Sequence, residues 1–125
     1  MVQLPTNERW RVLVVDDQQV SRDSIRAVIG LFPSLKIEGE VATGEEAIEF
    51  VGKSKPNLVL MDLNLPGING IEATRRLKEF YPELTVFIMT SNPPEGYRDA
   101  AFAAGATEYI AKSQIRKGLS RALFS

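Results

Sequence analysis

The chain has 125 residues, 25% of them charged, and a formal net charge of -1. That length suits one domain with one core, and the balanced charge excludes a basic nucleic-acid-binding surface. Cysteine and histidine are both absent, which excludes disulfides, thiolate and imidazole metal sites, and cysteine or histidine nucleophiles. Any chemistry must therefore rest on carboxylates, hydroxyls and amines.

The sequence also lacks the signals of a membrane or exported protein. No apolar run approaches the ~18 residues of a membrane-spanning helix. The start, MVQLPTNERW, lacks the basic-then-apolar order of a signal peptide. We therefore expect a cytoplasmic protein.

The first strand and helix are predicted near the amino terminus. The apolar run Val12–Val15 predicts a strand that ends at Asp16 and Asp17. The helix after it ends before Pro33 because proline cannot continue a helix. Five of its apolar side chains are expected close to one face: Val20, Ile25, Val28, Ile29 and Phe32.

The second pair follows at once. The segment LKIEGEVA, residues 35–42, predicts a strand in which the alternation of apolar residues is only partly kept. Thr43 and Glu46 have the T-x-x-E spacing of a capping box, which predicts that a helix begins there.

The second half of the chain predicts three more pairs. Strands are expected at Asn57–Met61, Leu84–Met89 and 108–112. Helices are expected at 70–81, 97–106 and 114–124. In the first of these helices Ile71, Leu77 and Phe80 are expected to face inward, and Pro93 and Pro94 are expected to stiffen the turn after the fourth strand.

This alternation of strands and helices predicts an α/β fold. Short apolar strands linked by helices form right-handed crossovers and a five-stranded parallel sheet, doubly wound with helices on both faces. The carboxyl ends of such strands face one crevice, where these folds bind ligands.

Polar side chains stand at these strand ends: Asp16, Asp17, Asp62, Thr90, Ser91 and Lys112. Three converging carboxylates require a compensating cation, because like charges raise one another's pKa. With only oxygen ligands available, Mg²⁺ fits better than zinc or copper.

The same residues suit phosphoryl transfer, which needs a nucleophile, a metal and a positive or hydrogen-bonding group. Asp62 is the candidate nucleophile, and Asp16 with Asp17 the candidate metal site. Lys112 is the candidate positive group, and Thr90 the candidate hydroxyl donor to a phosphoryl oxygen. The turn at Pro66-Gly67 would leave the face of Asp62 open.

With these residues in view, the sequence resembles the receiver domain of two-component response regulators over roughly residues 1–125. The resemblance is carried by four segments in order: LVVDD, LMDLNLPGINGIEATRRL, IMTS and AGATEYIAKS. It implies a flavodoxin-like fold and a phosphoryl group taken onto Asp62 from a phosphohistidine of a partner kinase. Such a domain catalyses only its own phosphorylation and dephosphorylation.

The resemblance also implies particular residue roles. Mg²⁺ would be held by Asp17, Asp62 and the backbone carbonyl of Asn64, with Asp16 acting nearby, partly through water. Lys112 would contact the acyl phosphate. The switch pair would be Thr90 and Tyr109, which rearrange when the phosphoryl group arrives.

Two features depart from the common pattern of this family. Ser113 follows Lys112 where proline is usual, and Pro93-Pro94 follows the fourth strand. The dipeptide KS is similar to that of receivers attached to helix-turn-helix domains. We therefore favour a receiver separated from a DNA-binding output domain over a stand-alone receiver, and the resemblance also allows a homodimer on phosphorylation.

Other interpretations stay open at this point. Taken singly, Asp16-Asp17 and Thr90 suit helix caps, and Asp62 suits a turn; Lys112 suits a solvated surface. An enzyme alternative is a Mg²⁺-dependent phosphatase of the haloacid dehalogenase type. A further alternative is a degenerate receiver that acts only as an interaction module.

Overall fold

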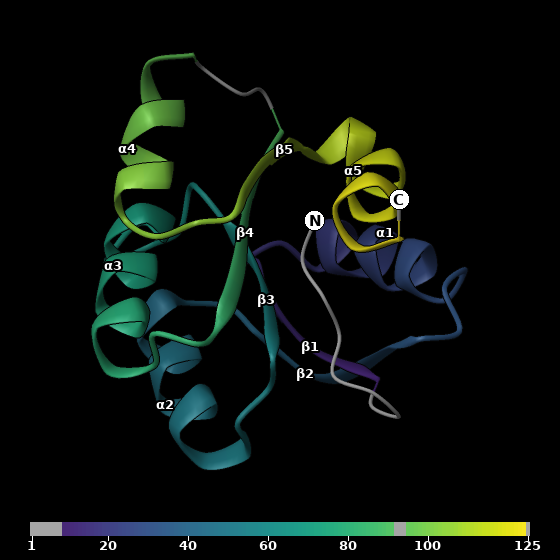
Figure 1. The fold of residues 1–125 in the computed structure, drawn as a ribbon, viewed down its shortest axis with the longest axis horizontal. Helices are drawn as coiled ribbons and strands as arrows, with labels where there is room; N and C mark the ends of the chain where they lie inside the picture. The colour runs from purple at the N-terminus through teal and green to yellow at the C-terminus, as the bar shows by residue number, and fades with distance from the viewer. Residues whose placement is uncertain (1–8, 92–94, 125) are drawn as a thin grey trace.

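A computed structural model describes residues 9–91 and 95–124 (Figure 1). Its five strands are β1 (Trp10–Val15), β2 (Leu35–Val41), β3 (Leu58–Asp62), β4 (Thr85–Thr90) and β5 (Glu108–Ala111). Its α-helices are α1 (Gln19–Ile29), α2 (Gly44–Ser54), α3 (Gly70–Phe80), α4 (Arg98–Ala103) and α5 (Ile115–Phe124). Two 3-10 turns precede α4 and α5, at Glu95–Tyr97 and Lys112–Gln114.

The strands form one parallel sheet in the order β2-β1-β3-β4-β5. Helices α1 and α5 cover one face, and α2, α3 and α4 cover the other (Figure 1). The predicted doubly wound α/β fold is therefore confirmed. The chain moves outward from β1 in both directions, so the carboxyl ends of β1 and β3 flank the switch point where such sheets bind ligands.

Alternate side chains of the central strands enter two cores. Val12 and Val14 of β1 pack under α1 and α5, whereas Leu13 and Val15 pack under α2 and α3. All five residues of β3 are buried. This is why the central strands read as continuous apolar runs rather than as alternating ones.

Two of the residues predicted to face inward do not. Val20 is 78% exposed. It lies nine residues, or two and a half helical turns, before buried Ile29, and so points to the opposite side of the helix. Phe80 is 71% exposed because it is the last residue of α3, and Tyr81 packs against the core in its place. The other expected core residues are buried or packed against the core: Ile25, Val28, Ile29, Phe32, Ile71 and Leu77.

The start of α2 confirms the predicted capping box. The Thr43 hydroxyl accepts the Glu46 N–H at 3.0 Å, and the Glu46 carboxylate accepts the Ala42 N–H at 3.2 Å. At the start of α3, Asn69 caps the helix in the same way, accepting the Glu72 N–H at 2.9 Å.

Several element bounds differ from those expected. Strand β1 begins at Trp10, and Asp62 is the last residue of β3 rather than the first residue of the loop. Helix α4 ends at Ala103 instead of residue 106, because Gly105 adopts a positive φ of 111° that leaves the helical region. Pro93 and Pro94 lie outside the described residues.

The described part of the chain contains no helix long and apolar enough to cross a bilayer.

Candidate functional site

The strand register brings the predicted site residues together. Val15 pairs with Met61, so Asp16 follows β1 beside Asp62 at the end of β3. Asp62 pairs with Met89, and Thr90 pairs with Ala111. Lys112 follows Ala111 directly, so one edge of the sheet collects the polar residues of four strands.

Burial divides the three carboxylates of this edge. Asp16 is fully buried and Asp62 is 5% exposed, whereas Asp17 is exposed. One carboxylate oxygen from each residue lies within 4.8 Å of the others. Oxygen ligands at this spacing fit a hard divalent cation, and the chain has no histidine or cysteine to favour a softer one.

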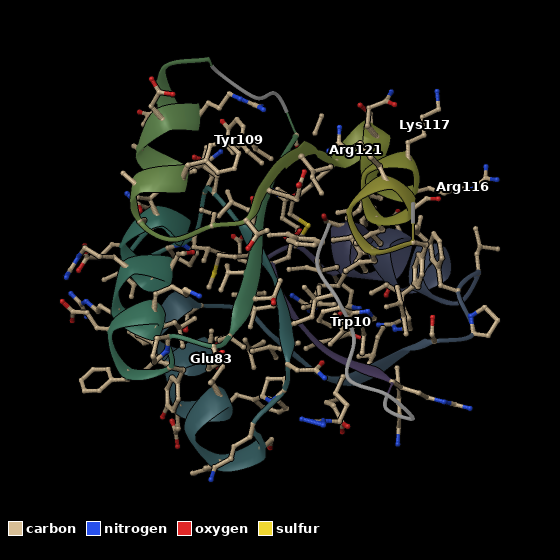
Figure 2. All side chains as sticks on the ribbon, in the orientation of Figure 1. Trp10, Glu83, Tyr109, Arg116, Lys117 and Arg121 are labelled. Carbon is tan, nitrogen blue, oxygen red and sulfur yellow. The ribbon has the colours of Figure 1, made fainter. Side chains whose placement is uncertain are left out.

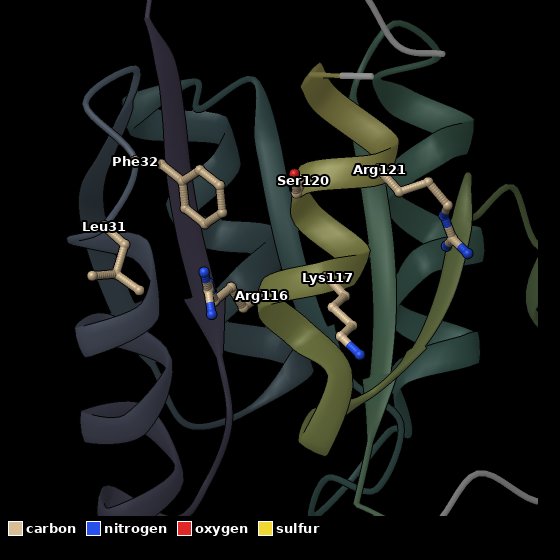
Figure 3. Close-up of a pocket in the computed structure, with 6 residues that line it drawn as sticks. All are labelled: Leu31, Phe32, Arg116, Lys117, Ser120 and Arg121. Atoms are coloured by element: carbon tan, nitrogen blue, oxygen red, sulfur yellow. The ribbon is translucent and has the colours of Figure 1, made fainter.

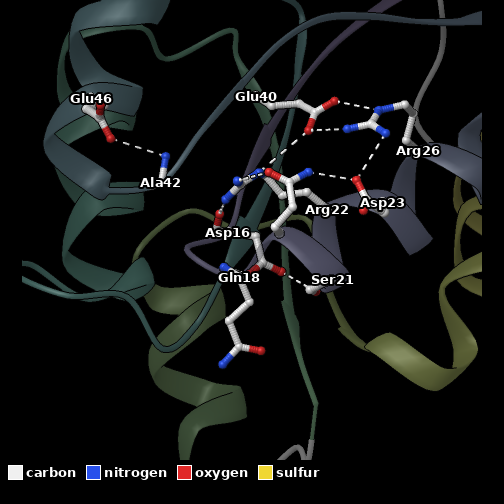
Figure 4. Close-up of polar contacts among 10 residues, drawn as sticks. Asp16, Gln18, Ser21, Arg22, Asp23, Arg26, Glu40, Ala42 and Glu46 are labelled. Atoms are coloured by element: carbon white, nitrogen blue, oxygen red, sulfur yellow. Dashed lines mark hydrogen bonds and ion pairs between the residues drawn. The ribbon is translucent and has the colours of Figure 1, made fainter.

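Asp16 is held by donors from the chain itself (Figure 4). Its Oδ1 accepts the Gln18 N–H at 3.0 Å, and its Oδ2 accepts the Ser21 hydroxyl. Its Oδ2 also accepts from the Lys112 ammonium at 2.6 Å. These bonds satisfy a buried charge that would otherwise be costly. Besides its predicted part in the metal site, Asp16 therefore ties the end of β1 to the start of α1 and to Lys112.

Lys112 joins Asp16 to Asp62. Its Nζ lies 2.6 Å from Asp16 Oδ2 and 3.3 Å from Asp62 Oδ2, and the side chain is 16% exposed. It is therefore not the solvated surface lysine of the alternative interpretation. One ammonium offsets only one of three negative charges, and a divalent cation would offset the other two.

The environment of Asp62 favours its protonated form. Burial raises the pKa of this carboxyl above its ordinary value, although the Lys112 charge opposes that rise, while the nearby Asp16 charge adds to it. The Asn64 N–H donates to Asp62 Oδ1 at 3.3 Å and also lowers the pKa. An ionised Asp62 is thus held in a site that is short of positive charge.

The predicted switch residues lie on one face of the sheet. Thr90 is 1% exposed and Tyr109 is 8% exposed. Tyr109 pairs with Ile88, which lies two residues before Thr90 and so shares its face. Figure 2 shows Tyr109 between β5 and α4.

Sequence reasoning missed Ser21 and Arg22, which support the site from α1. The Arg22 guanidinium donates to the backbone carbonyl of Asp16 at 2.6 Å and lies 3.6 Å from the Glu40 carboxylate (Figure 4). Ser21 contacts Asp16 and Lys112. Their position in the first turns of α1, just after the acidic pair, is the one signal that would have pointed to them.

Glycines allow the loop after Asp62 to fold back closely. Gly67 has a φ of 74°, and an added Cβ at Gly70 would lie 2.2 Å from the carbonyl oxygen of Asp62. The start of α3 therefore packs directly against the backbone of the site.

A separate groove lies between α1 and α5 (Figure 3). It has a volume of about 630 Å³ and six lining residues: Leu31, Phe32, Arg116, Lys117, Ser120 and Arg121. None of them is a strand-end residue, so this groove is not part of the candidate site.

Comparison with known proteins gives the family. The model of the response regulator receiver domain matches residues 12–124. The chain belongs to the response regulator receiver family. This membership favours the receiver interpretation over the phosphatase alternative.

Relatives of this receiver include transcriptional regulators. It is 31% identical over 113 residues to the transcriptional regulatory protein DegU of Brevibacillus brevis, covering 90% of the chain and 48% of the relative. It is 36% identical over 102 residues to the response regulator GacA of Pseudomonas viridiflava, covering 82% of the chain and 48% of the relative. The receiver thus spans about half the length of the curated relatives it matches.

Solved structures share the fold of this receiver. A LuxR-family two-component response regulator from Aurantimonas sp. SI85-9A1 has a TM-score of 0.85 and 33% identity, with 92% of this chain and 82% of that chain covered. The receiver domain of the putative response regulator NarL from Mycobacterium tuberculosis has a TM-score of 0.83 and 23% identity, with coverages of 92% and 96%. The second likeness concerns the fold alone.

Proposed function

We propose that Asp62 accepts a phosphoryl group from a phosphohistidine of a partner histidine kinase or phosphotransfer protein, in a Mg²⁺-dependent reaction. The observation that carries this proposal is the convergence of Asp16, Asp17 and Asp62 on Lys112 at one edge of the sheet. Structural ion pairs rarely leave a surplus of negative charge in a buried position, because an unpaired buried charge is costly.

In the proposed reaction a carboxylate oxygen of Asp62 attacks phosphorus. The new O–P bond forms as the P–N bond to the partner's imidazole breaks, and the imidazole leaves with that electron pair and takes up a proton. Lys112 lies where its ammonium can face a phosphoryl oxygen on Asp62, and the Thr90 hydroxyl ends the neighbouring strand. The Lys112 ammonium is held by Asp16 and Ser21 before the reaction, as transition-state stabilisation requires.

The metal would be held by Asp17, Asp62 and the backbone carbonyl of Asn64, with Asp16 nearby and partly acting through water. When bound, Mg²⁺ supplies positive charge that neutralises the phosphoryl oxygens. Asp17 is exposed and forms no hydrogen bond or ion pair with another side chain within residues 9–91 and 95–124. Asp16 is occupied by three donors, so we assign Asp17 the larger share of direct coordination.

The phosphoryl group would change the outer surface near α4, β5 and α5. It adds charge and acceptor oxygens at the strand ends. Thr90 would move toward it, and the Tyr109 ring would occupy the vacated space, so that a partner or a second copy of the chain reads the altered face. Both side chains share one face of the sheet, which supports this pairing.

The proposed biological setting is a cytoplasmic two-component system. We propose that residues 1–125 act as a single receiver unit that catalyses only its own phosphorylation and dephosphorylation. The relatives named as transcriptional regulators support attachment to a DNA-binding output domain. Direct binding of nucleic acid by this chain is not expected at a net charge of -1.

Intact mass after incubation with acetyl phosphate tests this function. Wild type with Mg²⁺ should gain about one phosphoryl mass, roughly 80 Da, and Asp62→Asn should gain none. Asp99→Asn, an exposed carboxylate change on α4, is the matched control and should gain the same mass as wild type. If folded wild type gains no adduct, the alternative of a degenerate receiver that acts only as an interaction module becomes the better interpretation.

A further inference from the structure

We propose that Ser21 is a positioning residue of this site, whose hydroxyl holds the Lys112 ammonium in the orientation that faces Asp62. The inference rests on the proposed function and adds a positioning residue to the same site. It comes from the contacts of one ammonium group with three side chains.

The ammonium of Lys112 has all three of its N–H donors directed at partners. Nζ lies 2.6 Å from Asp16 Oδ2, 2.9 Å from Ser21 Oγ and 3.3 Å from Asp62 Oδ2. A lysine ammonium has three donors and no acceptor. Two of the three contacts, to Asp16 and Ser21, therefore set how the third N–H points toward Asp62.

Ser21 is suited to this task because a hydroxyl both donates and accepts. The Ser21 hydroxyl oxygen accepts from Lys112, because an ammonium has donors but no acceptor, and the hydroxyl donates its own hydrogen to Asp16 Oδ2. Asp16, Ser21 and Lys112 therefore form a closed ring of hydrogen bonds. Removal of the hydroxyl would leave one Lys112 donor and one lone pair of Asp16 without this partner.

The helix that carries Ser21 is itself fixed to the sheet. Arg22, the residue after Ser21, donates to the Asp16 carbonyl at 2.6 Å and to the Gln19 side chain at 2.6 Å. Arg22 also lies 3.6 Å from Glu40 of β2. Ser21 thus presents its hydroxyl from a rigid support rather than from a free loop.

This restraint matters because the lysine side chain is flexible. Four methylene groups separate its ammonium from the backbone, so the head can swing when a partner is lost. The long separation of Lys112 and Ser21 in sequence, 91 residues, means that this contact exists only in the folded site. A less restrained ammonium would face the reacting oxygens for a smaller fraction of the time.

A pair of variants with the same shape separates the hydroxyl from the volume of the side chain. Ser21→Thr keeps the hydroxyl, and Ser21→Val replaces it with a methyl group. At saturating Mg²⁺, the Ser21→Thr variant should be phosphorylated by acetyl phosphate at a rate close to that of wild type, whereas the Ser21→Val variant should react about tenfold more slowly. The slower variant should keep the wild-type half-saturating concentration of acetyl phosphate, since binding is not the affected step.

A second measurement reads Lys112 without any phosphoryl transfer. Hydrogen exchange of the Lys112 ammonium, followed by nitrogen-15 NMR, should be slow in wild type and in Ser21→Thr and fast in Ser21→Val. Equal exchange in Ser21→Thr and Ser21→Val would overturn the inference. Equal phosphorylation rates of these two variants, when wild type does react, would overturn it as well. If wild type takes up no phosphoryl group, the proposed function fails. Slow exchange in wild type and Ser21→Thr with fast exchange in Ser21→Val would still support the restraint of Lys112 by Ser21.

Discussion

At the scale of single residues, the site is defined by how its charges are compensated. Asp16 is fully satisfied by donors of the chain, whereas Asp62 shares Lys112 with it at the longer distance of 3.3 Å. The acids and Lys112 could be predicted from the sequence because they stand directly at strand ends. Ser21 could not, because its role depends on the rotation of α1 and on a residue 91 positions away.

The raised pKa of Asp62 predicts a pH-dependent cost to stability. Because burial raises the folded-state pKa above the ordinary value of 3.8, the folded protein holds this proton more tightly than the unfolded chain. Folding therefore loses stability as pH rises from about the unfolded value through the folded one. Without metal at pH 7, Asp62→Asn should therefore raise the free energy of unfolding, because it removes the buried charge that the folded state disfavours.

Urea unfolding of both proteins at several pH values checks this prediction. The advantage of Asp62→Asn should shrink as pH falls and should vanish below the ordinary pKa of 3.8, where the wild-type carboxyl becomes protonated in both the folded and the unfolded state. Glu83→Gln, an exposed change near the start of β4, should shift stability by no more than about 0.5 kcal/mol. A variant less stable than wild type at pH 7 would contradict this view of Asp62.

At the scale of elements, most of the strands and helices could be predicted from the sequence. Periodicity and helix caps indicated them, and Thr43 marked the start of α2 correctly. The outward position of Phe80 could not be predicted, because helical spacing alone places it on the buried face of α3. Only the point at which the helix leaves the sheet shows that Tyr81 packs there instead.

Gly70 is predicted to be necessary where the loop from β3 enters α3, next to the site. An added Cβ would lie 2.2 Å from the Asp62 carbonyl oxygen and 3.0 Å from the Leu63 Cα, and backbone atoms cannot move aside alone. Gly70→Ala should therefore lower the free energy of unfolding by about 2–4 kcal/mol, at the upper end of the cost of overpacking.

A second glycine offers the control for this substitution. An added Cβ at Gly96, in the 3-10 turn before α4, meets no atom within 4 Å. Gly96→Ala should therefore change the midpoint of urea unfolding little, by an amount worth less than about 1 kcal/mol. Equal midpoints for the two variants would show that the close approach at Gly70 is not a constraint.

At the scale of the whole molecule, one edge of a five-stranded sheet gathers residues that are far apart in the chain. A parallel sheet could be predicted from the alternation of strands and helices, and its convergent edge followed from that architecture. The order β2-β1-β3-β4-β5 could not be derived from periodicity, which does not say which strands are neighbours. That order matches the fold implied by the family resemblance.

Metal binding is predicted to stabilise the whole domain. A cation that binds only the folded carboxylate cluster should raise the unfolding temperature by mass action, worth about 2.7 kcal/mol at a concentration 100-fold above the dissociation constant. Thermal unfolding of wild type should therefore shift upward with Mg²⁺. Asp17→Asn should shift much less, and Asp99→Asn should shift as wild type does; equal shifts in all three would place the metal elsewhere.

The most direct test of the central claim locates the phosphoryl group on the chain. After reaction with acetyl phosphate and Mg²⁺, an acyl phosphate can be reduced with borohydride to homoserine, which peptide mass spectrometry assigns to a position. We predict homoserine at position 62 alone, absent when Mg²⁺ is removed by a chelator. Homoserine at position 16 or 17, or a phosphoryl group that resists reduction on a hydroxyl side chain, would contradict the assignment of Asp62 as the acceptor.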